Sequence, residues 1–219
     1  MKRVNIICEG PTEERFVKDV LYPHFIVKGL ILTARTLGTG NKYGKLRYNI
    51  LEWMKEEPDA YVTTLIDLYG MNRHFPGYPE NKGKLPLDKV KAVEAAVKVD
   101  IDKEGFDPHR FIPYFQLHEF EALLFSAPDI LQEWLSLDRA IKPNTFQTIR
   151  NGFETPEHIN DDPNTAPSKR ILYAVPSYNK VAEGVLIASD IGLDRMRTAC
   201  LHFNAWITKM ETLVLTTNP

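Results

Sequence analysis

Strand-like and helix-like hydrophobic patterns alternate in the N-terminal part of the chain, and this order limits the fold more than any other feature. Short apolar runs over residues 4–8, 30–37 and 60–66 predict buried strands. Amphipathic patterns over residues 13–28 and 42–57 predict helices between them. Successive parallel strands need a long crossover, which a helix usually supplies. The order β-α-β-α-β therefore predicts an α/β fold with a mainly parallel sheet flanked by helices.

The rest of the chain is expected to contain more helix than strand. One further strand is expected over residues 111–117, where Pro113 favours an edge position or a strand start. Pro23 should kink or shorten the first helix. The later helical segments are expected at residues 87–104, 122–125, 129–137, 168–173, 180–188 and 193–212.

These patterns suggest a core and an appended part. We expect an α/β core over residues 1–125, with an insertion at about 70–105, and a helical extension over residues 126–219 packed on that core. The polar, proline-rich segment 72–86 is expected to be ordered, because its large apolar side chains need packing partners. These side chains are Phe75, Tyr78 and Leu85.

Composition excludes several classes of protein. A hydrophobic content of 43% is enough for a packed core and argues against disorder. The sequence shows no signal-peptide pattern and no apolar run of transmembrane length, so we expect a cytoplasmic protein without membrane contact. Cys8 and Cys200 lack metal-ligand spacing, which suits a reducing compartment. The net charge of −2 leaves nucleic acid open as a partner, because a local basic groove suffices for binding.

Acidic side chains follow the ends of the predicted strands. Glu9 comes directly after the first strand and before Gly10, where no local structural reason calls for a glutamate. Asp67 ends the third strand and precedes a turn. Ligands of open α/β sheets bind beyond the carboxyl ends of the strands, so we expect both carboxylates at one rim. Oxygen ligands without a cysteine or histidine cluster favour Mg²⁺ or Mn²⁺. The candidate metal ligands are Glu9, Glu13, Asp67, Glu119 and Glu121.

Two of these acids also have a structural alternative. Glu13 is equally suited to stabilise the first turn of a helix, where the helix dipole favours acids. Asp67 is suited to cap the turn that follows it. Glu119 and Glu121 share one side if the strand continues through them, whereas only one can face the rim if a helix has begun. His118 either orients a carboxylate or phosphate and carries a proton, or is a hydrogen-bonded, half-buried histidine.

Basic residues come late in the chain. Lys169 and Arg170 follow Ser168, a good N-cap whose helix N–H groups are suited to a phosphate. Lys180 follows a loop that begins at Pro176. We expect these three cations to contact a nucleic-acid backbone, with a merely solvated role as the alternative. The glycine loop 38–41 lacks the Gly-Lys-Ser/Thr sequence of a Walker loop, which argues against nucleotide hydrolysis.

Several segments together resemble a bacterial family catalogued as a domain of unknown function (4276). His118-Glu119-Phe120-Glu121-Ala122-Leu123 is the most specific part of the resemblance. Families of this kind are similar to TOPRIM proteins, whose metal-binding fold is shared by topoisomerases, primases and overcoming-lysogenization-defect nucleases. The segments that carry the resemblance are residues 8–13, 65–70, 118–125, 166–170 and 192–204.

The resemblance implies a TOPRIM-like core with a glutamate at the end of the first strand, here Glu9, and an Asp-x-Asp motif at a later strand, here Asp67. The second aspartate of that motif is replaced by Tyr69, which leaves Glu13, Glu119 or Glu121 to complete the site. In the overcoming-lysogenization-defect type, a glutamate in the position of Glu13 also binds metal. Such proteins are often encoded beside an ATPase and are associated with defence against phage, which implies an ATPase partner.

The expected function is Mg²⁺- or Mn²⁺-dependent endonucleolytic cleavage of DNA or RNA. Its catalytic residues would be the five acids named above together with His118. Two alternatives stay open: a degenerate, non-catalytic TOPRIM subunit that acts by protein docking, and a small-molecule phosphohydrolase. A covalent step on Tyr69 is disfavoured. The sequence is compatible with an oligomer, since Phe203 and Trp206 suit either a core or an interface.

Overall fold

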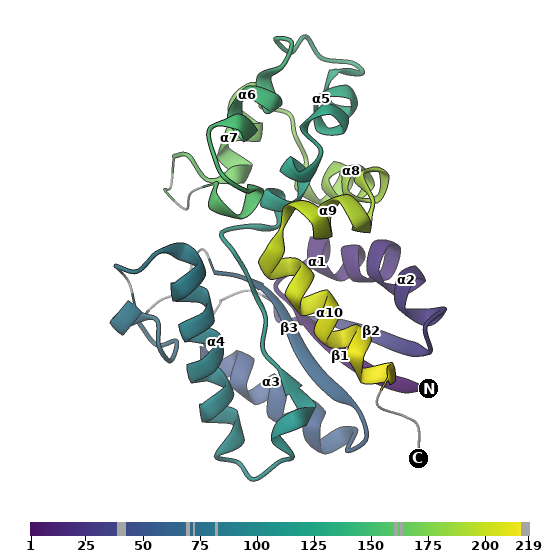
Figure 1. Ribbon diagram of the computed structural model, residues 1–219, viewed down its shortest axis with the longest axis vertical. Helices are drawn as coiled ribbons and strands as arrows, with labels where there is room; N and C mark the ends of the chain where they lie inside the picture. The colour runs from purple at the N-terminus through teal and green to yellow at the C-terminus, as the bar shows by residue number, and fades with distance from the viewer. Residues whose placement is uncertain are drawn as a thin grey trace.

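The fold is built around one sheet whose strand pairs are all parallel, and this confirms the expected α/β class (Figure 1). The strand order is β2-β1-β3-β4, with β5 paired to β3 beyond β4. The strands are β1 (Lys2–Cys8), β2 (Leu30–Thr36), β3 (Tyr61–Asp67), β4 (Phe111–Ile112) and β5 (Phe115–Gln116). The computed structural model describes residues 1–38, 43–68, 71, 73–81, 83–159, 162 and 164–215.

Helices cover both faces of the sheet, so the core has three layers (Figure 1). On one face lie α1 (Pro11–Phe16), the π-helical turn η1 (Val17–Leu21), α2 (Tyr22–Ile26) and α10 (Leu201–Leu215). On the other face lie α3 (Tyr43–Glu56) and α4 (Pro86–Asp102). Val4 and Ile6 belong to the first hydrophobic cluster and Ile7 to the second. Strand side chains alternate between faces, so this apolar strand, buried on both sides, supplies both cores.

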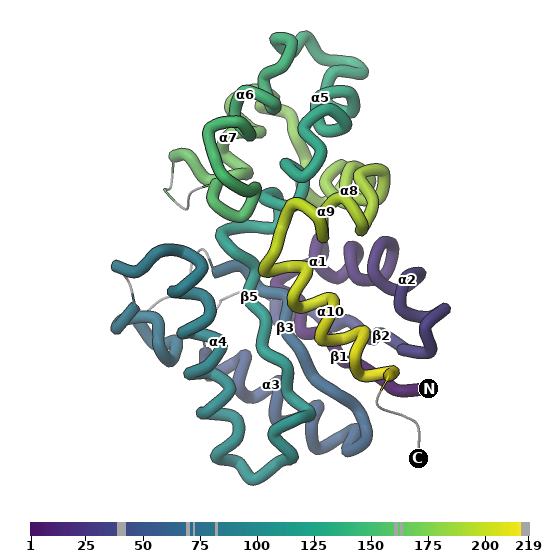
Figure 2. The backbone as a smooth tube through the Cα atoms, viewed as in Figure 1, coloured from purple at the N-terminus to yellow at the C-terminus, as the bar shows by residue number. Residues whose placement is uncertain are grey.

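The remaining helices form the part of the molecule drawn above the sheet in Figure 2. They are α5 (Pro128–Ser136), α6 (Thr145–Asn151), α7 (Pro167–Ala174), α8 (Val185–Ile191) and α9 (Leu193–Ala199). Shorter 3₁₀ and π turns are η2 (Pro79–Asn81), η3 (Pro108–Arg110), η4 (Phe120–Ser126), η5 (Pro156–His158) and η6 (Lys180–Gly184). One hydrophobic cluster joins Val4 of the sheet to Leu131 of α5 and Phe203 of α10. The division at residue 126 stays a prediction.

Every helix among the described residues is too short or too polar to cross a bilayer.

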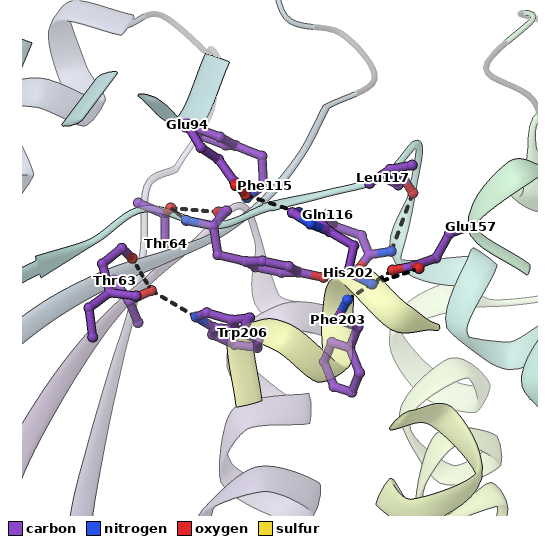
Figure 3. A network of polar contacts seen from close by, with 12 residues as sticks. Thr63, Thr64, Glu94, Phe115, Gln116, Leu117, Glu157, His202, Phe203 and Trp206 are labelled. Atoms are coloured by element: carbon purple, nitrogen blue, oxygen red, sulfur yellow. Dashed lines mark hydrogen bonds and ion pairs between the residues drawn. The ribbon is translucent and has the colours of Figure 1, made fainter. Parts of the chain in front are cut away.

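The predicted strand 111–117 is interrupted between β4 and β5. The Thr64 hydroxyl donates to the Tyr114 carbonyl at 2.6 Å and accepts from the Tyr114 N–H at 3.1 Å. Pro113, which has no N–H, precedes this residue. A side chain of β3 therefore replaces the backbone ladder at this point. Beside it, Trp206 of α10 donates to the Thr63 hydroxyl at 2.9 Å (Figure 3).

Two other expectations about local structure need correction. The predicted helix 193–212 is two helices, because Cys200 has an extended backbone (φ −117°, ψ 92°). Helix α6 was not predicted, and the segment expected as a helix at 122–125 is the 3₁₀ turn η4. Pro23 lies at the start of α2, so the α-helical hydrogen bonding of the first helical segment is interrupted by the π turn directly before the proline.

Apolar residues whose packing the sequence left open are mostly buried. Phe203 and Trp206 belong to the core, with 0% and 2% exposure. Phe75 in the proline-rich segment is 1% exposed, as expected, whereas Leu85 is 73% exposed and packs against little. Residues 39–41 of the glycine loop and Tyr69 lie outside the described residues.

Candidate functional site

The carboxyl ends of β1 and β3 bring Glu9 and Asp67 together, as the sequence predicted. Parallel register pairs Cys8 with Leu65, and the Glu9 N–H donates to the Leu65 carbonyl at 3.0 Å. The Glu9 side chain then turns toward β3, where its Oε2 accepts a hydrogen bond from the Asp67 N–H at 2.8 Å. The rim of the sheet therefore holds both acids as direct neighbours.

Glu13 combines the two roles that the sequence left open. Its Oε2 accepts from the Gly10 N–H at 3.0 Å, which closes a capping box at the start of α1. Its Oε1 lies 3.2 Å from Nζ of Lys180. At 3% exposure, this carboxylate is both a helix cap and a buried member of the acidic rim.

Glu119 and Glu121 point to different partners, because the strand has ended before them. Glu119 has an extended backbone and directly precedes η4, and its Oε2 accepts from the Ser168 N–H at 2.9 Å. Glu121, which is 1% exposed, lies 3.4 Å from Lys180 Nζ. Only Glu121 of the two pairs with Lys180. The N-cap of α7 is Ala166 rather than Ser168, and the Ser168 N–H donates to Glu119, so this N–H is not available to a phosphate.

Lys180 lies among the acids of the rim rather than in an isolated basic loop. Its ammonium nitrogen is 3.2 Å from Glu13, 3.4 Å from Glu121 and 3.7 Å from Asp67. About a third of the side chain, 35%, is exposed. Asn179 positions this residue, because its side chain accepts from the Ala182 N–H and caps η6. Sequence reasoning assigned Lys180 only to a nucleic-acid backbone and missed this cluster.

The cluster holds more negative than positive charge. Burial raises the pKa of Asp67 well above its usual value against the pull of Lys180, and Glu9 and Glu13 raise it further. Burial also raises the pKa of Glu9 and of Glu121. Burial lowers the pKa of Lys180, but the surrounding carboxylates outweigh it and hold that pKa well above its ordinary value. One ammonium therefore compensates the rim only in part.

The acidic rim suits a hard dication by its chemistry. Among the described residues, no three His, Cys, Asp or Glu side chains are arranged to hold a metal ion; the carboxylates meet at Lys180 instead. Asp67 Oδ1 and Glu121 Oε1 are buried and accept no hydrogen bond from the described residues. Buried carboxylate oxygens normally have partners, and an all-oxygen set is what Mg²⁺ and Mn²⁺ prefer. The residues present fit such an ion.

His118 is fully buried in a left-handed backbone conformation, with φ +63°. That conformation costs a non-glycine residue about 1–2 kcal/mol. It lies in the bend between β5 and η4, directly before Glu119. Full burial favours this structural role over proton transfer, because a proton carrier must exchange with water or substrate.

The other predicted cations differ in how they are held. Lys169 is exposed on α7. The Arg170 Nε donates to the Thr165 carbonyl at 2.6 Å, and its guanidinium lies 4.9 Å from the centre of the Phe153 ring. Contacts within the helical part of the protein therefore fix the position of the Arg170 guanidinium.

Tyr178 is a residue near the site that sequence reasoning missed. It is 8% exposed, and its hydroxyl makes no hydrogen bond to the described residues. Burial raises its pKa, and the Glu121 carboxylate adds to that effect. A β-carbon at Gly184 would lie 2.8 Å from the hydroxyl, so a larger residue there would require Tyr178 to shift. The sequence offered one indication that Tyr178 lies near the site, namely its position two residues before Lys180.

Comparisons with known proteins give a family and two solved structures. The model of the family described as "Domain of unknown function (DUF4276)" matches residues 8–211. The C-terminal region of the Burkholderia pseudomallei OLD protein is similar over 96% of this chain and 98% of that chain, with 15% identity and a TM-score of 0.48. The C-terminal region of the Xanthomonas campestris pv. campestris OLD protein is similar over 98% of this chain and 97% of that chain, with 14% identity and a TM-score of 0.46. No curated protein gives a significant match.

Proposed function

The chain belongs to the family described as Domain of unknown function (DUF4276), and from this premise we propose that it is a metal-dependent nuclease that hydrolyses phosphodiester bonds of DNA or RNA. The observation that carries the proposal is the convergence of Glu9, Asp67 and Glu121 on one buried, undercompensated acidic rim. Perturbed carboxylates of this kind gather at functional sites. The proposed defence against phage and the proposed ATPase partner rest on the family resemblance.

Four carboxylates would hold the metal: those of Glu9, Glu13, Asp67 and Glu121. Glu119 would be a fifth metal ligand through Oε1, because its Oε2 accepts a hydrogen bond from the Ser168 N–H. When bound, Mg²⁺ or Mn²⁺ lowers the pKa of an attacking water and neutralises charge that develops on the phosphate.

Lys180 would bind the substrate. Its ammonium already lies beside the acids, and its side chain is exposed enough to reach a phosphate oxygen. If the carboxylates that now hold Lys180 were compensated by a bound dication, the ammonium would be available to the nucleic acid. Lys169, which is exposed on α7, and Arg170 would contact other phosphates of the nucleic-acid backbone.

The non-catalytic alternative is favoured by the pairing of Lys180 with three acids of the rim. In a degenerate site, this lysine would replace the metal permanently and the protein would act by docking to a partner. Tyr69, in place of the second aspartate of the family motif, points the same way. The two functions differ in whether a dication can enter.

Cleavage of plasmid DNA and of RNA in Mg²⁺ or Mn²⁺ tests the proposal. The wild type is compared with Glu9→Gln and Asp67→Asn, which keep the side-chain size. Glu14→Gln is the matched control, because Glu14 of α1 follows Glu13 in the sequence but pairs with the exposed Lys18 rather than with Lys180. We expect cleavage by the wild type and the control, a loss of at least about 100-fold in the two rim variants, and none in EDTA. Equal background cleavage by all four proteins would retire the nuclease function. Hydrolysis of nucleotides or simple phosphoesters, with polymers untouched, would instead support the phosphohydrolase.

A further inference from the structure

A cavity of about 530 Å³ lies between α4 and α10, against the segment that contains β4. This volume is within the range of small-molecule sites, about 300–1,000 Å³. None of the acids of the rim lines it, and neither does Lys180. The cavity is therefore a second candidate site, and neither the family match nor the proposed nuclease accounts for it.

The polar part of the cavity wall is a buried acid–histidine pair (Figure 3). Glu94 of α4 and His202 of α10 are 9% and 8% exposed. Glu94 Oε1 accepts from the Phe115 N–H at 3.0 Å and lies 3.0 Å from His202 Nε2. Oε1 makes both contacts, so among the described residues Oε2 is left to accept from a ligand. The backbone of His202 is itself fixed, because its N–H donates to Glu157 Oε2 at 2.9 Å.

The apolar part of the cavity wall is rigid. Tyr114 and Trp206 stack with ring centres 4.3 Å apart and an angle of 9° between the rings. Both are at most 2% exposed, so they support the wall rather than move into the cavity. The facing helices contribute Ala95 and Ala205, both exposed, whose small side chains keep the mouth open. The mouth is therefore a narrow slot between two small side chains with a rigid wall behind it, a shape that suits a planar ring.

The rim of the cavity is basic. Lys91 and Lys209 are exposed, one from each helix, and neither forms an ion pair with another described residue. Lys98 also lines the cavity, but its ammonium is held by Asp102 at 2.9 Å. Of the charged lining residues, three are lysines and one is glutamate, whereas the whole chain carries a net charge of −2. The local reversal of charge favours an anionic ligand.

We propose that this cavity binds an organic phosphate with a flat, hydrogen-bonding ring, the chemical class of the nucleoside monophosphates. The ring lies between Ala95 and Ala205, where its N–H groups donate to Glu94 Oε2. The phosphate lies at the mouth between Lys91 and Lys209. The observations used here are separate from those that support the nuclease, so either proposal can fail alone.

Isothermal titration calorimetry of the full chain with AMP, GMP, CMP and UMP tests this proposal. Adenosine and inorganic phosphate are the partial ligands. We expect at least one nucleotide to bind the wild type more tightly than both partial ligands, because ring and phosphate each have a matched wall. Lys91→Glu/Lys209→Glu should weaken binding by about 10-fold or more. Ala205→Trp should abolish it by filling the slot.

Controls separate the cavity from general charge and from the acidic rim. Lys84→Glu/Lys142→Glu changes the charge equally at exposed lysines outside the cavity and should leave binding unchanged. Glu9→Gln should also bind normally. The proposal is overturned if no nucleotide binds the wild type at millimolar concentration, or if the control pair weakens binding as much as the cavity pair. Loss of binding in Glu9→Gln, or capture of an acidic peptide without any nucleotide, would overturn it as well.

Discussion

Glu9 accepts a hydrogen bond from the backbone N–H of Asp67, at 2.8 Å and across 58 positions of sequence. The contact joins the carboxyl ends of β1 and β3 and commits one oxygen of Glu9 to the backbone. Asp67 keeps its own carboxylate for the cluster, where Oδ2 lies 3.7 Å from Lys180 Nζ. The stability of the acidic rim therefore depends on the balance between buried carboxylates and a single ammonium.

Lys180→Met is expected to destabilise the protein at pH 7. The substitution removes the charge, keeps most of the volume and leaves Glu13, Asp67 and Glu121 without a counter-ion. Breaking a fully buried ion pair costs about 3–5 kcal/mol; because this lysine is partly exposed, we expect about 2 kcal/mol. Urea denaturation measures the change. Lys18→Met, at an exposed surface pair, should cost less than about 0.5 kcal/mol. An unchanged midpoint in Lys180→Met would contradict the charge balance described here.

Mn²⁺ is expected to raise the melting temperature of the wild type. An ion that binds only the folded state at about 100 times its Kd adds about 2.7 kcal/mol to the free energy of unfolding. Asp67→Asn and Glu121→Gln should lose most of the shift, and Glu14→Gln should keep it. Lys180→Met should show a larger shift than the wild type, because no ammonium competes for the carboxylates. Differential scanning fluorimetry measures all five proteins, and a wild type insensitive to Mn²⁺ would count against a metal at the rim.

Stability is expected to rise as the pH falls from 7 toward 5. The pKa of Asp67 is higher in the folded protein than in the unfolded chain, so the folded state takes up a proton first as the pH is lowered. The stability gained is complete below the unfolded pKa, near 4, and is lost again as the pH rises through the folded pKa. Asp67→Asn removes this group and should flatten the dependence in that window. Chemical denaturation at pH 5, 6 and 7 compares the two proteins; parallel curves would show that Asp67 does not titrate there.

Asn5→Val is expected to stabilise the protein. Asn5 lies in the middle of β1 with 0% exposure, and neither polar atom of its side chain bonds to a described residue. An unsatisfied buried polar group costs about 1–3 kcal/mol, and valine is a good strand residue. We expect the free energy of unfolding to rise by about 1 kcal/mol. Thr33→Val, on the neighbouring edge strand β2 and only half-buried, is the control and should change little. Destabilisation of Asn5→Val would indicate that a buried water satisfies the asparagine.

Local patterns in the sequence were sufficient for the sheet and for half of the site. The apolar runs at 4–8, 30–37 and 60–66 mark β1, β2 and β3 to within one or two residues. A run buried on both faces between two helical patterns leaves little choice but a parallel strand. The parallel arrangement also predicts that Glu9 and Asp67 are neighbours, because residues at the carboxyl ends of adjacent parallel strands lie at the same edge of the sheet.

The remaining features were decided by tertiary contacts. Whether Glu119 or Glu121 faces the rim depends on where β5 ends, and β5 stops at Gln116, before the left-handed backbone of His118. Lys180 lies among the acids because η6 packs beside α1 and η4. No periodic pattern in the sequence predicts this packing. Hydrophobic periodicity reports which face a residue buries within its own element. It carries no information about which distant element will cover that face, so the partner of a charge is determined only when the helices pack.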